Sequence, residues 1–207
     1  MIKTKAKPAA KTRIQSENQD LILKAALDVF STYGFRGATV DQIAVKCGLS
    51  KPNLLYYFRR KEDLYVAVLE QTLTQWLAPL RMLDVNNDPI AELTRYIETK
   101  LDMSFANPAA SKLFANEILH GAPHVANYLK GPLKDLVEAK SAVLRQWIAE
   151  NKIRPIDPRH FIFAIWAITQ HYADFSVQVE VLLKPAEKPA AIKASVVEIL
   201  LRGLKVA

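Results

Sequence analysis

The chain has 207 residues, of which 50% are apolar and 24% are charged, a balance typical of an ordinary globular protein. It contains 6 glycines and no run of alternating β-branched residues, so an all-β fold is excluded. The single cysteine, Cys47, excludes an intrachain disulfide framework and a zinc site built from several cysteines. No signal-peptide pattern and no membrane-length apolar stretch is present, so we expect a cytoplasmic protein.

Positive charge is concentrated near the N-terminus. The chain carries 28 Lys and Arg against 21 Asp and Glu, a net charge of +7. Residues 1–61 hold 12 of these basic and 4 of these acidic side chains, so the rest of the chain is nearly neutral. Five basic residues precede the first acidic one: Lys3, Lys5, Lys7, Lys11 and Arg13. We predict a basic disordered arm over residues 1–15, which either solubilises the chain or follows a phosphate backbone.

Helix signals follow this arm. Ser16 and Gln19 form a capping-box pattern ahead of an apolar helical stripe, and Gly34 and Gly37 are expected to end that helix. A fourth helix is predicted to begin near Lys61, after two short helices described below. Ser16 is expected to cap the first helix of the chain.

Two short helices are predicted between residues 39 and 58. Thr39 and Gln42 form a second capping box, and Gly48 closes the helix that it opens. Ser50 can cap the next helix, whose first turn tolerates Pro52. A short helix, a tight glycine-containing turn and a second short helix form the helix-turn-helix arrangement.

The later part of the chain is also predicted to be helical. Three pairs place a capping side chain before a proline at a helix start: Asp88-Pro89, Asn107-Pro108 and Asp157-Pro158. A long helix is predicted over residues 158–183 and a last one over about 190–204, where it either forms a dimer surface or closes the monomer core. The fold class is all-α, with about nine helices.

The second helix of the motif has a polar N-terminal end, as a DNA recognition helix does. Asn53 can pair with an adenine edge, and Lys51 can reach a guanine or a phosphate. The plain alternative is a helical hairpin with a solvated polar face, but the concentration of positive charge favours DNA. The candidate DNA-binding residues are Thr39, Ser50, Lys51, Pro52, Asn53, Tyr56, Tyr57 and Lys61.

Residues 30–65 resemble the N-terminal domain of the TetR family of bacterial transcriptional regulators. The matching positions are Phe30, Gly34, Phe35, Thr39, Ile43, Ala44, Gly48, Ser50, Tyr57, Phe58, Lys61 and Leu64. Leu55 departs from the family's frequent tyrosine, and Arg60 departs from its usual serine cap. The resemblance implies a homodimeric repressor that binds a near-palindromic operator, with a DNA-binding domain at 16–63 and a ligand-binding and dimerisation domain at 64–207.

The second domain holds aromatic and polar residues at helical spacing. Phe163, Trp166, Gln170 and Asp174 fall on one predicted stripe. Gln170 offers one donor and one acceptor, as a planar heterocyclic amide requires, although it could instead lie at a dimer seam.

Several segments of this domain are similar to pyrimidine-responsive members of the family. The likeness implies that uracil or thymine releases the protein from its operator, with another planar or apolar molecule as the alternative. It implies a pocket formed by Trp76, Trp166, Gln170, Lys100, Glu117 and Tyr172.

A small helical enzyme is the rival interpretation, but it leaves the basic first third unexplained. Its acid–base candidates are Glu117, His120, Gln170, His171 and Asp174. A metal site at His120 and His124 is disfavoured, because Gly121 and Pro123 break the helix between them. We therefore expect no enzymatic activity, no cofactor and no metal.

Overall fold

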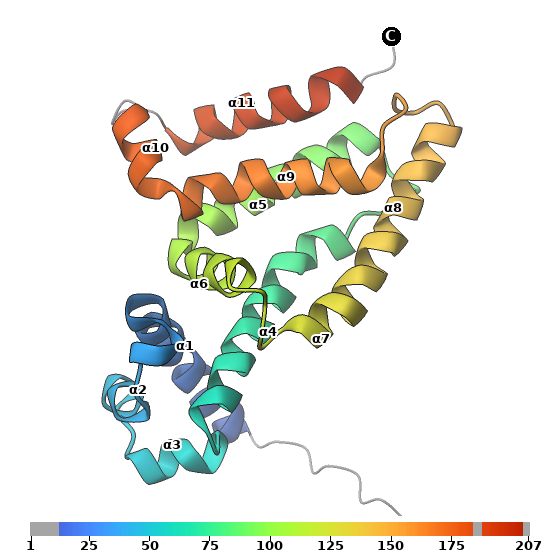
Figure 1. Ribbon diagram of the computed structural model, residues 1–207. Coiled ribbons are helices and arrows are strands. Elements are labelled where there is room, and N and C mark those ends of the chain that lie inside the picture. The colour runs from blue at the N-terminus through green and yellow to red at the C-terminus, as the bar shows by residue number, and fades with distance from the viewer. Residues whose placement is uncertain (1–12, 184–187, 205–207) are drawn as a thin grey trace, which may run out of the picture. The chain divides into compact units, whose positions relative to one another are not determined.

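The computed structural model describes residues 13–183 and 188–204. Every regular element over those residues is helical (Figure 1), which confirms the all-α prediction. The chain divides into two compact units, Met1–Val68 and Leu69–Ala207. No helix within the described ranges is both long and apolar enough to cross a membrane. The basic arm predicted over residues 1–15 lies, for residues 1–12, outside the described residues.

The first unit contains three helices and the start of a fourth. These are α1 (Arg13–Gly37), α2 (Val40–Cys47), α3 (Lys51–Tyr57) and α4 (Lys61–Arg81), which continues into the second unit. Helix α1 begins at Arg13, so the prediction that Ser16 caps it is wrong. Gly34, with φ +67°, interrupts the helical backbone where the helix was expected to end.

The predicted caps and the glycine turn of the helix-turn-helix motif are confirmed. The Thr39 side chain accepts from the Gln42 backbone N–H, while Gln42 Oε1 accepts from the Thr39 backbone N–H at 2.8 Å. Gly48 ends α2 in the left-handed region, at φ +69°. Ser50 Oγ accepts from the Asn53 backbone N–H at the start of α3. These local bonds fix the turn between α2 and α3.

The first unit has its own apolar core. Ile22 and Phe30 of α1, Ile43 of α2 and Leu54 of α3 are almost fully buried. Tyr65 of α4 packs edge-on against Phe30, with 4.9 Å between ring centroids. Leu54 is the one fully buried residue of α3, whose other side chains are half-buried or exposed.

The second unit is also entirely helical over its described residues. Its elements are the end of α4, α5 (Pro89–Ala106), α6 (Pro108–Leu119), α7 (Ala126–Tyr128), a π-helical turn (Leu129–Leu133), α8 (Lys134–Ala149), α9 (Pro158–Asp174), α10 (Ser176–Leu182), α11 (Pro189–Leu201) and a 3₁₀ turn (Arg202–Leu204). With the helices of the first unit, the described residues hold α1 to α11, of which α7 has only 3 residues, so their number is close to the predicted nine or so.

All three predicted caps before proline are confirmed. Asp88 accepts from the Ala91 N–H at 2.8 Å and Asn107 accepts from the Ala110 N–H at 3.1 Å. Asp157 accepts from two backbone N–H groups, and these bonds lower the pKa of its carboxyl group. These caps set the starts of α5, α6 and α9.

One prediction about the C-terminal helices is wrong, and one of the two alternatives for the last helix is supported. The helix expected over 158–183 ends at Asp174, and Phe175 separates it from α10. The side chains of Ile192 and Val196 on α11 are buried in the core of their own unit, where α11 packs on α5. This part of α11 therefore closes the monomer core, while Ile199 remains 69% exposed.

Trp147 of α8 is the largest fully buried side chain of this core. Its Nε1 donates to the Val85 carbonyl oxygen at 2.9 Å. Replacing Trp147 with Phe removes that donor and leaves a cavity, so we expect the free energy of unfolding to fall by about 2–3 kcal/mol in urea titrations. Gln146→Ala, on an exposed position of the same helix, is the control. A loss below about 0.5 kcal/mol would contradict this packing.

Candidate functional site

The N-terminal side of α3 presents most of the predicted DNA-binding residues to solvent. Lys51, Pro52, Asn53 and Tyr56 are exposed on α3, and so are its cap Ser50 and the α2 cap Thr39. Tyr56 is 75% exposed, which leaves a large aromatic side chain available for a partner. The first unit therefore places six of the eight candidate residues at its surface.

The two lysines of the predicted set have different surroundings. Lys51 Nζ forms an ion pair with Asp41 Oδ2 at 2.8 Å. Both side chains are about half exposed or more, so this pair contributes little stability and can exchange for a phosphate. Lys61 Nζ instead donates to the carbonyl oxygens of Phe35 and Ala38, at 2.7 and 2.9 Å. Lys61 thus satisfies two carbonyl oxygens at the C-terminal end of α1. Its third N–H can donate to a phosphate.

Tyr57 is half-buried and connects two helices of the first unit. Its hydroxyl oxygen accepts a hydrogen bond from Asn18 Nδ2 at 3.0 Å. Its ring lies edge-on to Tyr56, with 5.4 Å between centroids. Tyr57 therefore positions α3 against α1, a contact that its sequence separation from Asn18 does not reveal.

Arg60 adopts a role that sequence reasoning did not anticipate. Its guanidinium binds both carboxylate oxygens of Asp63, at 2.6 and 3.2 Å. This contact raises the pKa of Arg60 and lowers that of Asp63. The adjacent Arg59 is exposed and was not among the candidates.

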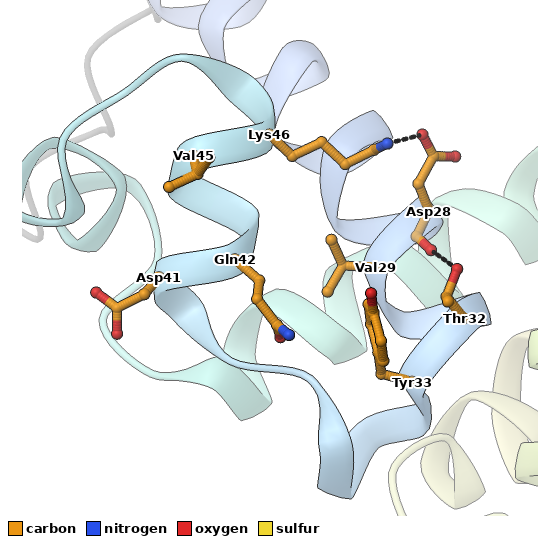
Figure 2. A pocket seen from close by; sticks show the side chains of 8 residues that line it. All are labelled: Asp28, Val29, Thr32, Tyr33, Asp41, Gln42, Val45 and Lys46. Atoms are coloured by element: carbon orange, nitrogen blue, oxygen red, sulfur yellow. Dashed lines mark hydrogen bonds and ion pairs between the residues drawn. The ribbon is translucent and has the colours of Figure 1, made fainter.

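An open hollow of about 490 Å³ lies between α1 and α2 (Figure 2). Lys46 and Asp28 form an ion pair at 3.2 Å on one side, and Asp41 lies on the α2 side. The ring of Tyr33 projects beside Val29. None of the eight candidate DNA-binding residues lines this hollow.

Two predicted effector residues meet in the core of the second unit. The Lys100 ammonium of α5 lies over the Trp76 ring of α4, with 4.4 Å between Nζ and the ring centroid. Both side chains are buried. Burial lowers the pKa of Lys100 to about 8, against the opposing influence of Asp174. A flat aromatic ring and a desolvated cation thus lie in contact in this core.

The other aromatic candidates have partners of their own. Trp166 Nε1 donates to the Tyr96 hydroxyl oxygen at 2.7 Å, and burial raises the pKa of Tyr96. Tyr172 packs edge-on against Phe105, with 6.0 Å between centroids. Trp166 and Tyr172 are partly buried and pack against the hydrophobic core of the second unit.

The remaining two candidates, Gln170 and Glu117, have different surroundings. Gln170 is half-buried, and its side chain has no hydrogen bond to any residue of the described ranges. Glu117 is buried, and its Oε1 accepts from the His124 backbone N–H at 2.7 Å. His124 Nδ1 lies 3.1 Å from Glu117 Oε2. The structure therefore shows Glu117 holding the loop after α6.

A second hollow lies on α9 and α10 and is lined by Asp174 and Phe175 together with residues of α10. None of the six predicted effector residues lines it. Among the residues with described positions, no group of three His, Cys, Asp or Glu side chains could hold a metal ion. Cys47 is buried and its Sγ lies 3.4 Å from the Ala44 carbonyl oxygen, as a packing residue does.

Two family models together cover most of the chain. Residues 22–68 match the model described as bacterial regulatory proteins, tetR family. Residues 69–206 match the YcdC-like protein, C-terminal region, of TetR regulators. The chain therefore belongs to the TetR family of DNA-binding transcriptional regulators.

Individual relatives agree with this class. The chain is 51% identical over 170 residues to the HTH-type transcriptional regulator RutR of Escherichia coli (strain K12), which covers 82% of this chain and 80% of that protein. It is 30% identical over 148 residues to the HTH-type transcriptional repressor NicS of Pseudomonas putida, covering 66% and 69% of the two chains. These relatives are transcriptional regulators, in agreement with the prediction of a non-enzymatic protein.

Solved structures share the fold. The putative transcriptional regulator SCO4942 from Streptomyces coelicolor superposes with a TM-score of 0.74 at 26% identity, over 90% of this chain and 98% of that one. AibR in complex with isovaleryl coenzyme A and operator DNA superposes with a TM-score of 0.64 at 17% identity, over 88% and 97%. The second likeness shows the fold alone.

Proposed function

We propose that the protein is a homodimeric repressor that a pyrimidine base, uracil or thymine, releases from a near-palindromic DNA operator. The 51% identity to RutR over 82% of the chain carries this proposal. The likeness of its second-domain segments to pyrimidine-responsive regulators supports uracil or thymine as the effector. The buried Trp76 ring, with Lys100 over it, supports a planar polar ligand.

DNA binding is assigned to the exposed side of α3. In this proposal Lys51, Asn53 and Tyr56 meet base edges or phosphates, with Pro52 at the helix start, while Thr39, Ser50 and Lys61 contact phosphates near helix N-termini. Tyr57 positions α3. Residues 1–12 are assigned to the basic arm, because residues 13–15 belong to α1. Residues 16–63 are assigned to the DNA-binding domain and residues 64–207 to the effector domain. A regulator of chromosomal DNA acts in the cytoplasm.

Dimerisation is assigned to α9 and α11. Phe163 on α9 is 49% exposed and Ile199 on α11 is 69% exposed, and two such helices from each copy can form a four-helix contact. We expect Phe163→Glu and Ile199→Glu together to convert a dimer into a 23.3 kDa monomer in light scattering. Glu180→Lys on α10 is the charge-changing control. A double variant that stays dimeric would place the interface elsewhere.

Helix α4 connects the two functions in one element. It carries Lys61 at its start and Trp76 fifteen residues later, a separation of about 22 Å along a helix. An effector that contacts Trp76 can favour one position of α4 and thereby change the spacing of the two recognition helices, about 34 Å in the DNA-bound state. The effector can change DNA affinity only by the difference between its binding free energies for the DNA-bound and the released conformations, about 1–3 kcal/mol.

Thermal unfolding with a panel of compounds tests the effector. Uracil, thymine, cytosine, xanthine and an apolar set are each added to the purified protein. A ligand at 100 times its dissociation constant adds about 2.7 kcal/mol to the free energy of unfolding, which gives a clear rise in Tm. We expect stabilisation by uracil or thymine. Stabilisation by an apolar compound instead, with no response to either pyrimidine, would reject the pyrimidine effector.

A further inference from the structure

The ion pair between Lys51 and Asp41 joins the two helices of the helix-turn-helix motif. Lys51 is the first residue of α3, and Asp41 lies in the first turn of α2. Lys51 Nζ donates to Asp41 Oδ2 at 2.8 Å, across ten positions of the chain. The ammonium group that the proposed function assigns to DNA is therefore bound by a carboxylate of its own domain.

Binding of Lys51 to a DNA phosphate competes with this contact. An ammonium group has three donors, but a phosphate that shares it with Asp41 brings a second negative charge close to the carboxylate. Two negative charges at that separation repel each other, so DNA binding favours a Lys51 side chain that has left Asp41. The free energy gained at the phosphate is then partly offset by the loss of the ion pair.

The surroundings of the pair permit this exchange. The Lys51 and Asp41 side chains are 50% and 64% exposed, and Asp41 lines the open hollow between α1 and α2 (Figure 2). Water therefore solvates the carboxylate when Lys51 leaves, and no buried charge loses its partner. Helix α2 also keeps its cap, because the capping box uses Thr39 and Gln42 rather than Asp41. The contact can thus break while both helices stay folded.

A second ion pair of the same unit provides a matched comparison. Lys46 of α2 and Asp28 of α1 lie 3.2 Å apart, and their side chains are 46% and 48% exposed. Neither residue is among the candidate DNA-binding residues. The two pairs have the same charges and similar exposure, so a comparison of them separates a specific effect of Asp41 from a general effect of net charge.

We infer that Asp41 restrains the DNA affinity of the recognition helix by holding Lys51 in an ion pair that DNA must displace. Asp41 is a positioning residue, because it acts through Lys51 and not by contact with the operator. This inference rests on the proposed function, which assigns Lys51 to DNA. An exposed ion pair is equivalent to a factor of about 1.4 to 5 in an equilibrium constant, so the two pairs of a homodimer are equivalent to about 2- to 30-fold in DNA affinity.

A double-mutant cycle measured by fluorescence anisotropy tests the restraint. The probe is a labelled duplex selected from genomic fragments by its binding to the protein. We expect Asp41→Asn to bind this duplex about 2- to 30-fold more tightly than the unmodified chain, and Lys51→Met to bind it more weakly. In a chain that already carries Lys51→Met, adding Asp41→Asn should change the affinity by less than about 1.5-fold, because the interaction is already removed. Circular dichroism and Tm measurements verify that each variant is folded.

Salt dependence is a second readout, which a purely structural role of Asp41 would not change. Each phosphate that a lysine neutralises releases about 0.9 counterions from the duplex. In the unmodified chain Asp41 attracts cations from solution as Lys51 leaves, and this uptake partly cancels the release. We therefore expect log affinity to fall more steeply with log salt in Asp41→Asn, by a slope of up to about 0.9 for each head of the dimer.

Asp28→Asn is the matched control, because it removes the same charge from the comparison pair. It should bind the duplex within about 1.5-fold of the unmodified chain, since an exposed pair away from the DNA contacts contributes little. An unchanged affinity in Asp41→Asn, an equal gain in Asp28→Asn, or a gain that persists with Lys51→Met would each overturn the inference. A loss of affinity in Lys51→Met would still leave the proposed DNA contact standing. A Lys51→Met variant that binds as tightly as the unmodified chain would overturn both the contact and the inference.

Discussion

A double variant in which alanine replaces both Asn53 and Tyr56 is expected to bind operator DNA at least about 30-fold more weakly. Both side chains are exposed on α3, and loss of base contacts costs about 1–3 kcal/mol in each DNA-binding head. A homodimer carries two heads, so the cost doubles, and each 1.4 kcal/mol is tenfold in affinity. Fluorescence anisotropy with a labelled operator duplex measures the change.

Salt dependence provides the control for this experiment. Asn53 and Tyr56 are assigned to bases, so the double variant should keep nearly the same slope of log affinity against log salt as the unmodified chain. Removing a phosphate-binding lysine should instead reduce the slope. Lys134→Ala, in the other unit, should change neither affinity nor slope. Operator affinity unchanged in the double variant would contradict the assignment of α3 as the recognition helix.

The second large effect is expected for Lys100→Met, which should make the protein more stable but unresponsive to its effector. We expect Lys100→Met to abolish the response of operator binding to uracil and, without ligand, to raise the Tm by about 2–4 °C. Lowering a lysine pKa from 10.5 to about 8 corresponds to a cost of about 3 kcal/mol for the buried charge. The Trp76 ring offsets up to about 2 kcal/mol of that cost. Methionine removes the remaining penalty, about 1 kcal/mol.

The pH dependence of this difference follows from the same charge. Below pH 8 Lys100 is protonated in both the folded and the unfolded state, so the folded chain bears the full penalty. Between pH 8 and 10.5 the folded state releases the proton while the unfolded state keeps it, and stability rises with pH. The Tm advantage of Lys100→Met should therefore shrink over this range. A constant difference from pH 7 to 10 would contradict a buried, charged lysine.

Local signals predicted the starts and ends of most helices. Thr39, Ser50, Asp88, Asn107 and Asp157 all cap the helices that their sequence patterns indicated. Capping depends on atoms within three residues of each other, so a sequence contains nearly all the information that determines it.

Contacts between distant residues were not available from sequence. Lys61 bonds the carbonyl oxygens of Phe35 and Ala38, and Tyr57 bonds Asn18, across 23 to 39 residues. The pattern of α11 was correctly apolar, but an apolar stripe does not specify whether it covers its own core or a second copy. Tertiary packing decided these cases.

In the candidate effector site too, the sequence indicated individual residues but not the contacts between them. The sequence indicated Trp76 and Lys100 separately, and the structure places them in contact. Asp174 was noted as part of a helical stripe, but the influence of its charge on the pKa of Lys100 depends on how α5 and α9 pack. Periodicity identifies a face, whereas the distance between two faces is a property of the fold.

Release of operator DNA by uracil tests the account most directly. Genomic fragments selected for binding to the protein supply a labelled duplex, and its affinity is measured by anisotropy with and without saturating uracil. The account predicts that uracil weakens DNA binding by about 5- to 150-fold and that Lys100→Met removes this response. Uracil that binds the protein yet leaves operator affinity unchanged, in the unmodified chain, would contradict it.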